Sequence, residues 1–115
     1  MKICLIYNKK SSRGNRSIHV KKIYEEIKKR FIIDLYETKT EQEASDIIKN
    51  IQKNKYDRLI LAGGDGTVLF AINEIIKFED KFLASLVIGY IPCGTANILK
   101  HELKEHIHSI QILLS

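Results

Sequence analysis

The segment Leu59-Ile60-Leu61-Ala62-Gly63-Gly64-Asp65-Gly66-Thr67 decides how this chain folds. Its first four residues are all apolar, a pattern typical of a strand buried on both faces of a sheet. Three glycines within four residues come next. Because a simple turn needs fewer, the backbone there either adopts positive φ or lies very close to another group. Apolar residues then recur with helical spacing, at Val68, Ile72, Ile75 and Ile76. The segment therefore predicts a strand, a glycine-rich loop and a helix that runs through those four residues.

The same alternation of short apolar runs and amphipathic stretches continues on both sides of this segment. Further strands are predicted at residues 3–7, 31–36 and 86–91. Further helices are predicted by three apolar faces, namely Val20, Ile23, Tyr24 and Ile27; Ala44, Ile47, Ile48 and Ile51; and Leu99, Leu103, Ile107, Ile110 and Leu114. The second of these helices follows a capping-box pattern, Thr40 with Glu43. Because parallel strands need a crossover connection, the order β-α-β-α-β-α-β-α predicts a Rossmann-like α/β domain with helices on both faces of a parallel sheet.

Length and composition set the broad class of the protein. A chain of 115 residues suits one compact domain, here residues 1–115. With 44% hydrophobic and 29% charged residues, the composition is that of a globular protein rather than a disordered one. The net charge of +5 comes from lysines interspersed with glutamates, which indicates a solvated surface; attraction to an anionic membrane or a polyphosphate stays open.

Several features bear on location and partners. The two cysteines, Cys4 and Cys93, are far apart and form neither a disulfide framework nor a metal-ligand cluster. The N-terminal residues lack the pattern of a signal peptide, and no apolar run approaches the ~18 residues that span a bilayer. We therefore expect a cytoplasmic protein, with the inner membrane face as a further candidate location. Tyr7, Tyr36 and Tyr56 are not interleaved with basic residues, which indicates packing, so no nucleic-acid partner is expected.

Three loops follow the predicted strands at their carboxyl ends, where ligands bind in such sheets: residues 8–15, 63–67 and 92–97. In the middle loop, glycine N–H groups can face a phosphate, and the N-terminus of the next helix adds its positive dipole end. A carboxylate there would repel phosphates unless a divalent cation lies between, so Asp65 is interpreted as a magnesium-side group. Thr67 either binds a phosphate or caps the helix. The structural alternative is a tight turn with Asp65 or Thr67 as N-cap. The loop matches neither the P-loop nor the dinucleotide G-x-G-x-x-G spacing.

Two motifs together carry a family resemblance. The pairing of Gly63-Gly64-Asp65-Gly66-Thr67 with Ile91-Pro92-Cys93-Gly94-Thr95-Ala96-Asn97 resembles the catalytic domain of bacterial diacylglycerol kinase-like lipid kinases. The resemblance extends over the whole chain, because Tyr7-Asn8 with Ser11, Ser12 and Gly14 resembles the first loop of that family, and Thr38 with Ala44 stands where the family has a threonine before its second helix.

The resemblance implies an NAD kinase/diacylglycerol kinase-like N-terminal domain that binds ATP with Mg²⁺ in one cleft. It implies Asp65 as the catalytic candidate. The implied nucleotide-binding residues are Asn8, Ser11, Ser12, Thr38, Gly63, Gly64, Asp65, Gly66, Thr67, Gly94 and Thr95. No residue is assigned as a direct metal ligand.

The sequence also departs from the family pattern. Leu69-Phe70 replaces the Asn-Glu that commonly follows the loop, Lys9 replaces the first-loop proline, and Ile98 replaces a frequent aspartate. In the family a second, β-rich domain supplies the lipid cleft and the general base. That domain is absent from these 115 residues, so this part is expected to be incomplete on its own.

These observations lead to one main prediction and two alternatives. The main prediction is the ATP-binding domain of a kinase that phosphorylates a diacylglycerol-like lipid alcohol at a membrane surface. The first alternative is a non-catalytic remnant, or a split-gene subunit that works with a separately encoded C-terminal half. The second is an NAD kinase-like or phosphofructokinase-like enzyme. An apolar face left exposed would favour a homo-oligomer.

Overall fold

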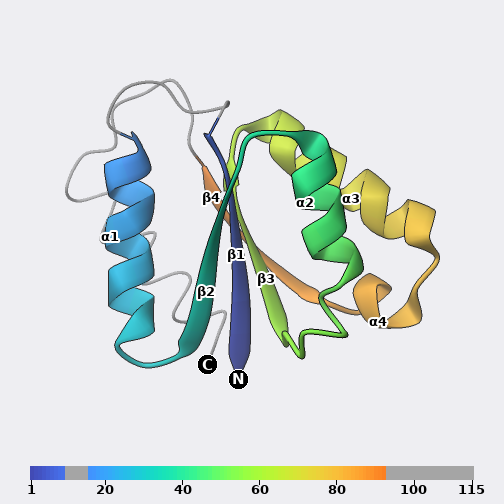
Figure 1. The fold of residues 1–115 in the computed structure, drawn as a ribbon, viewed down its shortest axis with the longest axis horizontal. Coiled ribbons are helices and arrows are strands. Elements are labelled where there is room, and N and C mark those ends of the chain that lie inside the picture. The colour runs from blue at the N-terminus through green and yellow to red at the C-terminus, as the bar shows by residue number, and fades with distance from the viewer. Residues whose placement is uncertain (10–15, 93–115) are drawn as a thin grey trace.

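The sheet has four parallel strands. We describe residues 1–9 and 16–92 of a computed structural model of the chain. The strands are β1 (Lys2–Asn8), β2 (Ile32–Thr38), β3 (Arg58–Gly63) and β4 (Val87–Pro92), and they lie in the order β2-β1-β3-β4 (Figure 1). The predicted α/β class and parallel sheet are confirmed. Because the chain adds β2 on one side of β1 and β3 on the other, the topological switch point lies between β1 and β3, where ligands bind in such folds.

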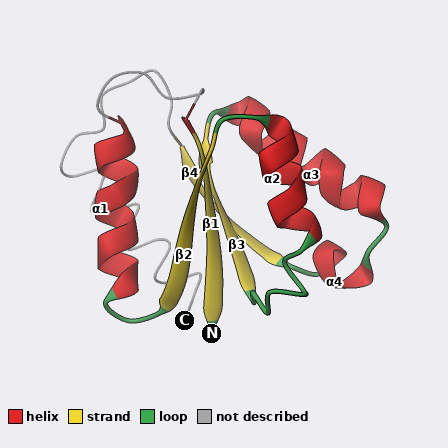
Figure 2. Cartoon of the chain, in the orientation of Figure 1, coloured by secondary structure: helices red, strands yellow, loops and turns green. Residues whose placement is uncertain are grey.

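Helices cover both faces of this sheet. Helix α1 (Arg16–Lys28) lies against one face, and α2 (Glu41–Lys49) and α3 (Asp65–Phe78) lie against the other (Figure 2). A short helix α4 (Lys81–Ala84), which the sequence analysis did not predict, precedes β4. It begins at the N-cap Asp80, whose carboxylate accepts hydrogen bonds from the backbone N–H groups of Phe82 and Leu83.

Strand side chains alternate between two apolar cores. The first core joins the sheet to α1 and contains Ile3, Leu5, Tyr7, Val20, Ile23, Ile27, Ile33, Ile60, Ala62 and Ile91. The second joins the sheet to α2, α3 and α4 and contains Cys4, Ile6, Ile48, Ile51, Tyr56, Leu59, Leu61, Ala71, Ile75 and Leu83. The central strands β1 and β3 are therefore buried on both faces, as predicted. The edge strands β2 and β4 are only partly buried, because Ile32, Val87 and Tyr90 are exposed.

Helix α2 begins as the sequence predicts. The Thr40 hydroxyl accepts a hydrogen bond of 3.2 Å from the Glu43 N–H. The Glu43 carboxylate accepts from the Lys39 N–H at 3.1 Å, one residue before the position that a standard capping box uses. The helix ends at Lys49, so Ile51 belongs to the following turn rather than to the helix, although it is fully buried.

Helix α3 contains the four apolar residues through which the sequence predicts it, and they differ in burial. Ile75 is buried, but Ile72 and Ile76 are 42% and 67% exposed. The inward face instead uses Ala71 and Ile75, with Val68 and Phe78 partly buried beside them. The helix carries apolar residues on several sides, so more than one helical face fits the 3.6-residue period.

A hydrogen-bonded cluster lies on the α2 side of the sheet. The Tyr56 hydroxyl donates to Asp34 Oδ2 at 2.6 Å, and because its proton is used there, the Tyr36 hydroxyl donates to Tyr56 at 2.5 Å. Burial and the hydrogen bond to Asp34 raise the pKa of Tyr56 well above its usual range. Burial, and then the Asp34 charge, raise the pKa of the Cys4 thiol to about 12. The Cys4 thiol and the Tyr56 hydroxyl therefore pack in their neutral forms.

The strand register brings the predicted loops together. Asn8 pairs with Thr38, Tyr7 pairs with Ala62, and Gly63 pairs with Pro92, so the ends of all four strands meet at one edge of the sheet. Within residues 1–9 and 16–92, no helix has the length and apolar character of a membrane span.

Candidate functional site

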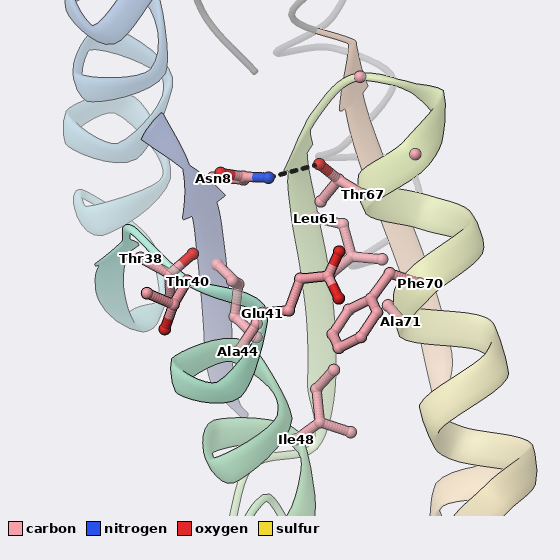
Figure 3. Close-up of a pocket in the computed structure, with 13 residues that line it drawn as sticks. Asn8, Thr38, Thr40, Glu41, Ala44, Ile48, Leu61, Thr67, Phe70 and Ala71 are labelled. Carbon is pink, nitrogen blue, oxygen red and sulfur yellow. Dashed lines mark hydrogen bonds between the residues drawn. The ribbon is translucent and has the colours of Figure 1, made fainter. Parts of the chain in front are cut away.

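A cleft of about 230 Å³ opens at this carboxyl edge, between α2 and α3 (Figure 3). The strands supply its floor and the two helices supply its walls. Its lining residues are Ile6, Asn8, Thr38, Thr40, Glu41, Ala44, Ile48, Leu61, Gly64, Gly66, Thr67, Phe70 and Ala71. Farther along the helices, the Ser45 hydroxyl donates to Glu74 Oε2 at 3.2 Å, which links the two walls.

One end of the cleft is polar. The Asn8 amide donates to the Thr67 hydroxyl at 3.3 Å, which joins the end of β1 to the first turn of α3 (Figure 3). Thr38 is the one polar residue among those classed as buried in the described part of the chain, and its hydroxyl donates to the Tyr7 carbonyl at 3.4 Å. Both threonine oxygens can accept a further hydrogen bond from a ligand.

The N-terminus of α3 is open at the same end. Its N-cap is Gly64, which has no side chain to bond the first N–H groups, whereas Thr40 and Asp80 cap α2 and α4 with their side chains. The Thr67 N–H donates back to the Gly64 carbonyl at 3.0 Å. A helix end without a side-chain cap presents N–H donors and the positive end of the dipole, which together suit an anion such as a phosphate.

Neither backbone conformation nor packing requires glycine at Gly66. Gly64 has φ of −87°, and Gly66 lies in the first turn of α3, so positive φ explains neither residue. A Cβ atom at Gly66 would meet no other part of the protein within 4 Å, so close packing does not explain that glycine either. Gly66 lines the cleft. The open space beside Gly66 is compatible with a bound group that approaches the backbone there.

The structure gathers five of the predicted site residues in one cleft: Asn8, Thr38, Gly64, Gly66 and Thr67. Gly63 lies just below them as the buried last residue of β3, and its carbonyl accepts a hydrogen bond of 3.0 Å from the Tyr90 hydroxyl. Asp65 is the first residue of α3. Ser11, Ser12, Gly94 and Thr95 lie outside the described residues.

The helical walls add residues that the sequence analysis did not assign to the site, namely Thr40, Glu41, Ala44 and Phe70. Leu69 and Phe70 lie on different sides of α3. Phe70 lines the cleft, whereas Leu69 is 61% exposed and lies outside the cleft lining. The capping-box pattern could have indicated that Glu41 lies at the site, because the pattern places the first turn of α2 directly after Thr38.

The described residues differ in how well they fit a nucleotide's phosphates and Mg²⁺. The open N-terminus of α3 and the space above Gly66 fit a polyphosphate. Residues 1–9 and 16–92 contain no group of three or more His, Cys, Asp or Glu side chains that could hold a metal. Mg²⁺ that binds with a nucleotide usually takes only one or two protein carboxylates, and Asp65 is the loop residue that could provide one.

A parallel sheet with a cleft at its carboxyl edge, a glycine-rich loop and an open helix N-terminus is the arrangement typical of α/β domains that bind a ligand at that edge. Comparison of the sequence with known families then gives its membership. The chain belongs to the diacylglycerol kinase catalytic domain family, whose sequence model matches residues 2–113.

Individual relatives agree with this family. Sphingosine kinase 1 of Arabidopsis thaliana is 29% identical over 100 residues, which cover 86% of this chain and 20% of that protein. The mitochondrial acylglycerol kinase of Xenopus laevis is 38% identical over 74 residues, which cover 62% of this chain and 17% of that protein. A crystal structure of a diacylglycerol kinase from Bacillus anthracis matches with a TM-score of 0.67 and 25% identity, over 96% of this chain and 42% of that one. This chain thus spans less than half the length of each of these relatives.

Proposed function

We propose that this chain is the nucleotide-binding part of a lipid kinase, which binds ATP with Mg²⁺ in the cleft between α2 and α3. The single observation that carries the proposal is the convergence of Asn8, Thr38, Gly64, Gly66 and Thr67 on one cleft beside an uncapped helix N-terminus. The family match supports phosphoryl transfer to a lipid. The acceptor in this proposal is a diacylglycerol-like lipid alcohol at the inner face of a membrane.

Each part of the cleft has a role in this reaction. The first-turn N–H groups of α3 bind the phosphates, and Gly66 keeps the approach to them clear. Asn8 and Thr67 fix the position of the loop relative to β1 through their hydrogen bond. Asp65 holds the metal side of the polyphosphate, where Mg²⁺ would neutralise charge that develops during transfer. The γ-phosphoryl group passes to the lipid hydroxyl, the hydroxyl proton leaves to a base, and ADP remains.

Two measurements on the purified chain test the proposal. Isothermal titration of the folded protein with ATP and MgCl₂ should give saturable binding. Transfer of ³²P from labelled ATP to diacylglycerol in mixed micelles tests turnover. Absence of binding heat from protein with a normal circular dichroism spectrum would refute the proposed function.

A second candidate function is nucleotide binding without turnover, which covers both a remnant and a subunit that acts with a separately encoded C-terminal half. The observation that favours it is the apolar Phe70 ring in the wall of the cleft, where the family commonly has polar residues. Binding of ATP without label transfer would support this candidate, and transfer by the chain alone would exclude it.

A further inference from the structure

An exposed apolar stripe runs along α3, on a side of the helix that does not line the cleft. The stripe consists of Leu69, Ile72 and Ile76, which are all exposed and all outside the cleft lining. Their spacing of three and then four residues places them on one face of the helix. Adjacent exposed apolar side chains of this kind are typical of interaction surfaces.

The stripe forms one wall of a groove of about 380 Å³. Ile72 and Ile76 line that wall. The segment from α4 to β4 supplies further apolar lining, with Leu83, Leu86 and Ile88. None of the described residues that line this groove also lines the cleft, so the two hollows are separate.

Strand β4, which borders the groove, is an outer strand without charged residues. It ends the order β2-β1-β3-β4 of the described sheet, and its sequence is Val-Ile-Gly-Tyr-Ile-Pro (Figure 1). Outer strands that face water usually carry charges, which discourage association. The opposite outer strand, β2, follows this rule with Asp34 and Glu37. The β4 side of the domain is therefore the side suited to contact with another protein surface.

The charges around the groove argue against a membrane as the occupant. Residues 65–92, which form α3, α4 and β4, contain four acidic and two basic residues. Apolar surfaces that enter an anionic bilayer are instead flanked by basic residues. In the described part of the chain, a run of basic residues lies elsewhere, at the end of α1 and just after it, with Lys28, Lys29 and Arg30.

The stripe matches a second copy of itself. Consider two α3 helices that lie antiparallel about a two-fold axis beside Ile72. Leu69 of one copy then lies opposite Ile76 of the other, and the two Ile72 side chains meet at the axis. The spacing of three and four residues lets the side chains of one helix fit between those of the other. Each stripe thereby removes the other from water.

We propose that two copies of this chain associate through the stripe and the groove, with their α3 helices antiparallel. The cleft stays open in this dimer, because the groove shares no described residue with it. An interface built on one helix and one groove per copy belongs to the small class, for which we expect a dissociation constant of about 10–100 µM. At about 1 µM the chain is then mostly monomeric.

Sedimentation equilibrium over about 1–500 µM measures this association. The mass should rise from the 13.3 kDa of one chain toward twice that value. Ile76→Lys places a charge in the contact and should raise the dissociation constant at least about tenfold. Ile32→Lys is the matched control, because Ile32 is an equally exposed isoleucine on the opposite outer strand, and it should leave the dissociation constant unchanged.

A mixture of two variants tests the antiparallel arrangement. Leu69→Glu and Ile76→Lys should each weaken self-association. Mixed together, they should form a heterodimer with one Glu–Lys pair and one intact Leu69–Ile76 contact, and this heterodimer should be tighter than either variant alone. A mass of one chain at every concentration, equal weakening by Ile32→Lys and Ile76→Lys, or no gain in the mixture would overturn the inference. None of these outcomes depends on nucleotide, so they leave the test of the proposed function separate.

Discussion

The substitution Gly66→Ala separates folding from binding because the two effects should have opposite signs. A Cβ at this position meets no protein atom within 4 Å, so the variant should fold without strain. Alanine favours the helix over glycine by about 0.5–1 kcal/mol in an interior position, and the lower value suits the first turn. For a domain of this size, about 0.5 kcal/mol corresponds to a rise in Tm of about 2–4 °C.

The same methyl group should weaken nucleotide binding. It would stand in the space through which a phosphate reaches the first-turn N–H groups of α3, and we expect a loss of about tenfold or more in ATP affinity, near 1.4 kcal/mol. Calorimetric titration with ATP and MgCl₂ measures the affinity, and differential scanning calorimetry measures Tm.

A matched control lies on the same helix. Asn73 is exposed and outside the cleft lining, so Asn73→Ala should raise Tm by a similar amount and leave ATP affinity unchanged. The reasoning is refuted if Gly66→Ala raises Tm while ATP binds as tightly as before, because the phosphates would then lie away from this loop. A drop in Tm would contradict the open space at Gly66.

Three further predictions concern stability. In urea unfolding, Tyr56→Phe should lower the free energy of unfolding by about 1–3 kcal/mol, because Asp34 and Tyr36 lose their shared hydrogen-bond partner. The Tyr24 hydroxyl makes no hydrogen bond within the described residues, so Tyr24→Phe should change the free energy of unfolding little. The pKa of Cys4 is raised to about 12 and that of Tyr56 is also raised, so the free energy of unfolding should be constant with respect to these two groups below pH ~9 and should fall as the pH rises above it. Urea unfolding at pH 7, 9 and 11 measures this, and an equal free energy of unfolding at all three values would contradict it. Finally, Ile75→Ala should lower the free energy of unfolding by about 2–4 kcal/mol and Ile76→Ala by under about 1 kcal/mol, because Ile75 is 8% and Ile76 is 67% exposed. Equal losses of stability in the two variants would contradict this difference in burial.

The sequence by itself determined the class of fold and the position of the site. Uniformly apolar strands can be buried on both faces only in a sheet covered by helices, and the carboxyl ends of parallel strands must share one edge. The loops after those strands were therefore bound to meet, and Asn8, Thr38 and Gly64 do so. The Thr40 cap was readable because capping depends on neighbouring residues alone.

Only the tertiary structure decided which of several possible faces each helix buries and what lies across the cleft. Ile75 and Ile76 look alike in a helix that is apolar on several sides, and the choice between them depends on how α3 packs against the sheet and α4. Glu41 and Phe70 belong to different helices, and they face each other because α2 and α3 pack side by side on one face of the sheet. Contacts between elements far apart in sequence arise from packing and register, which local patterns do not encode.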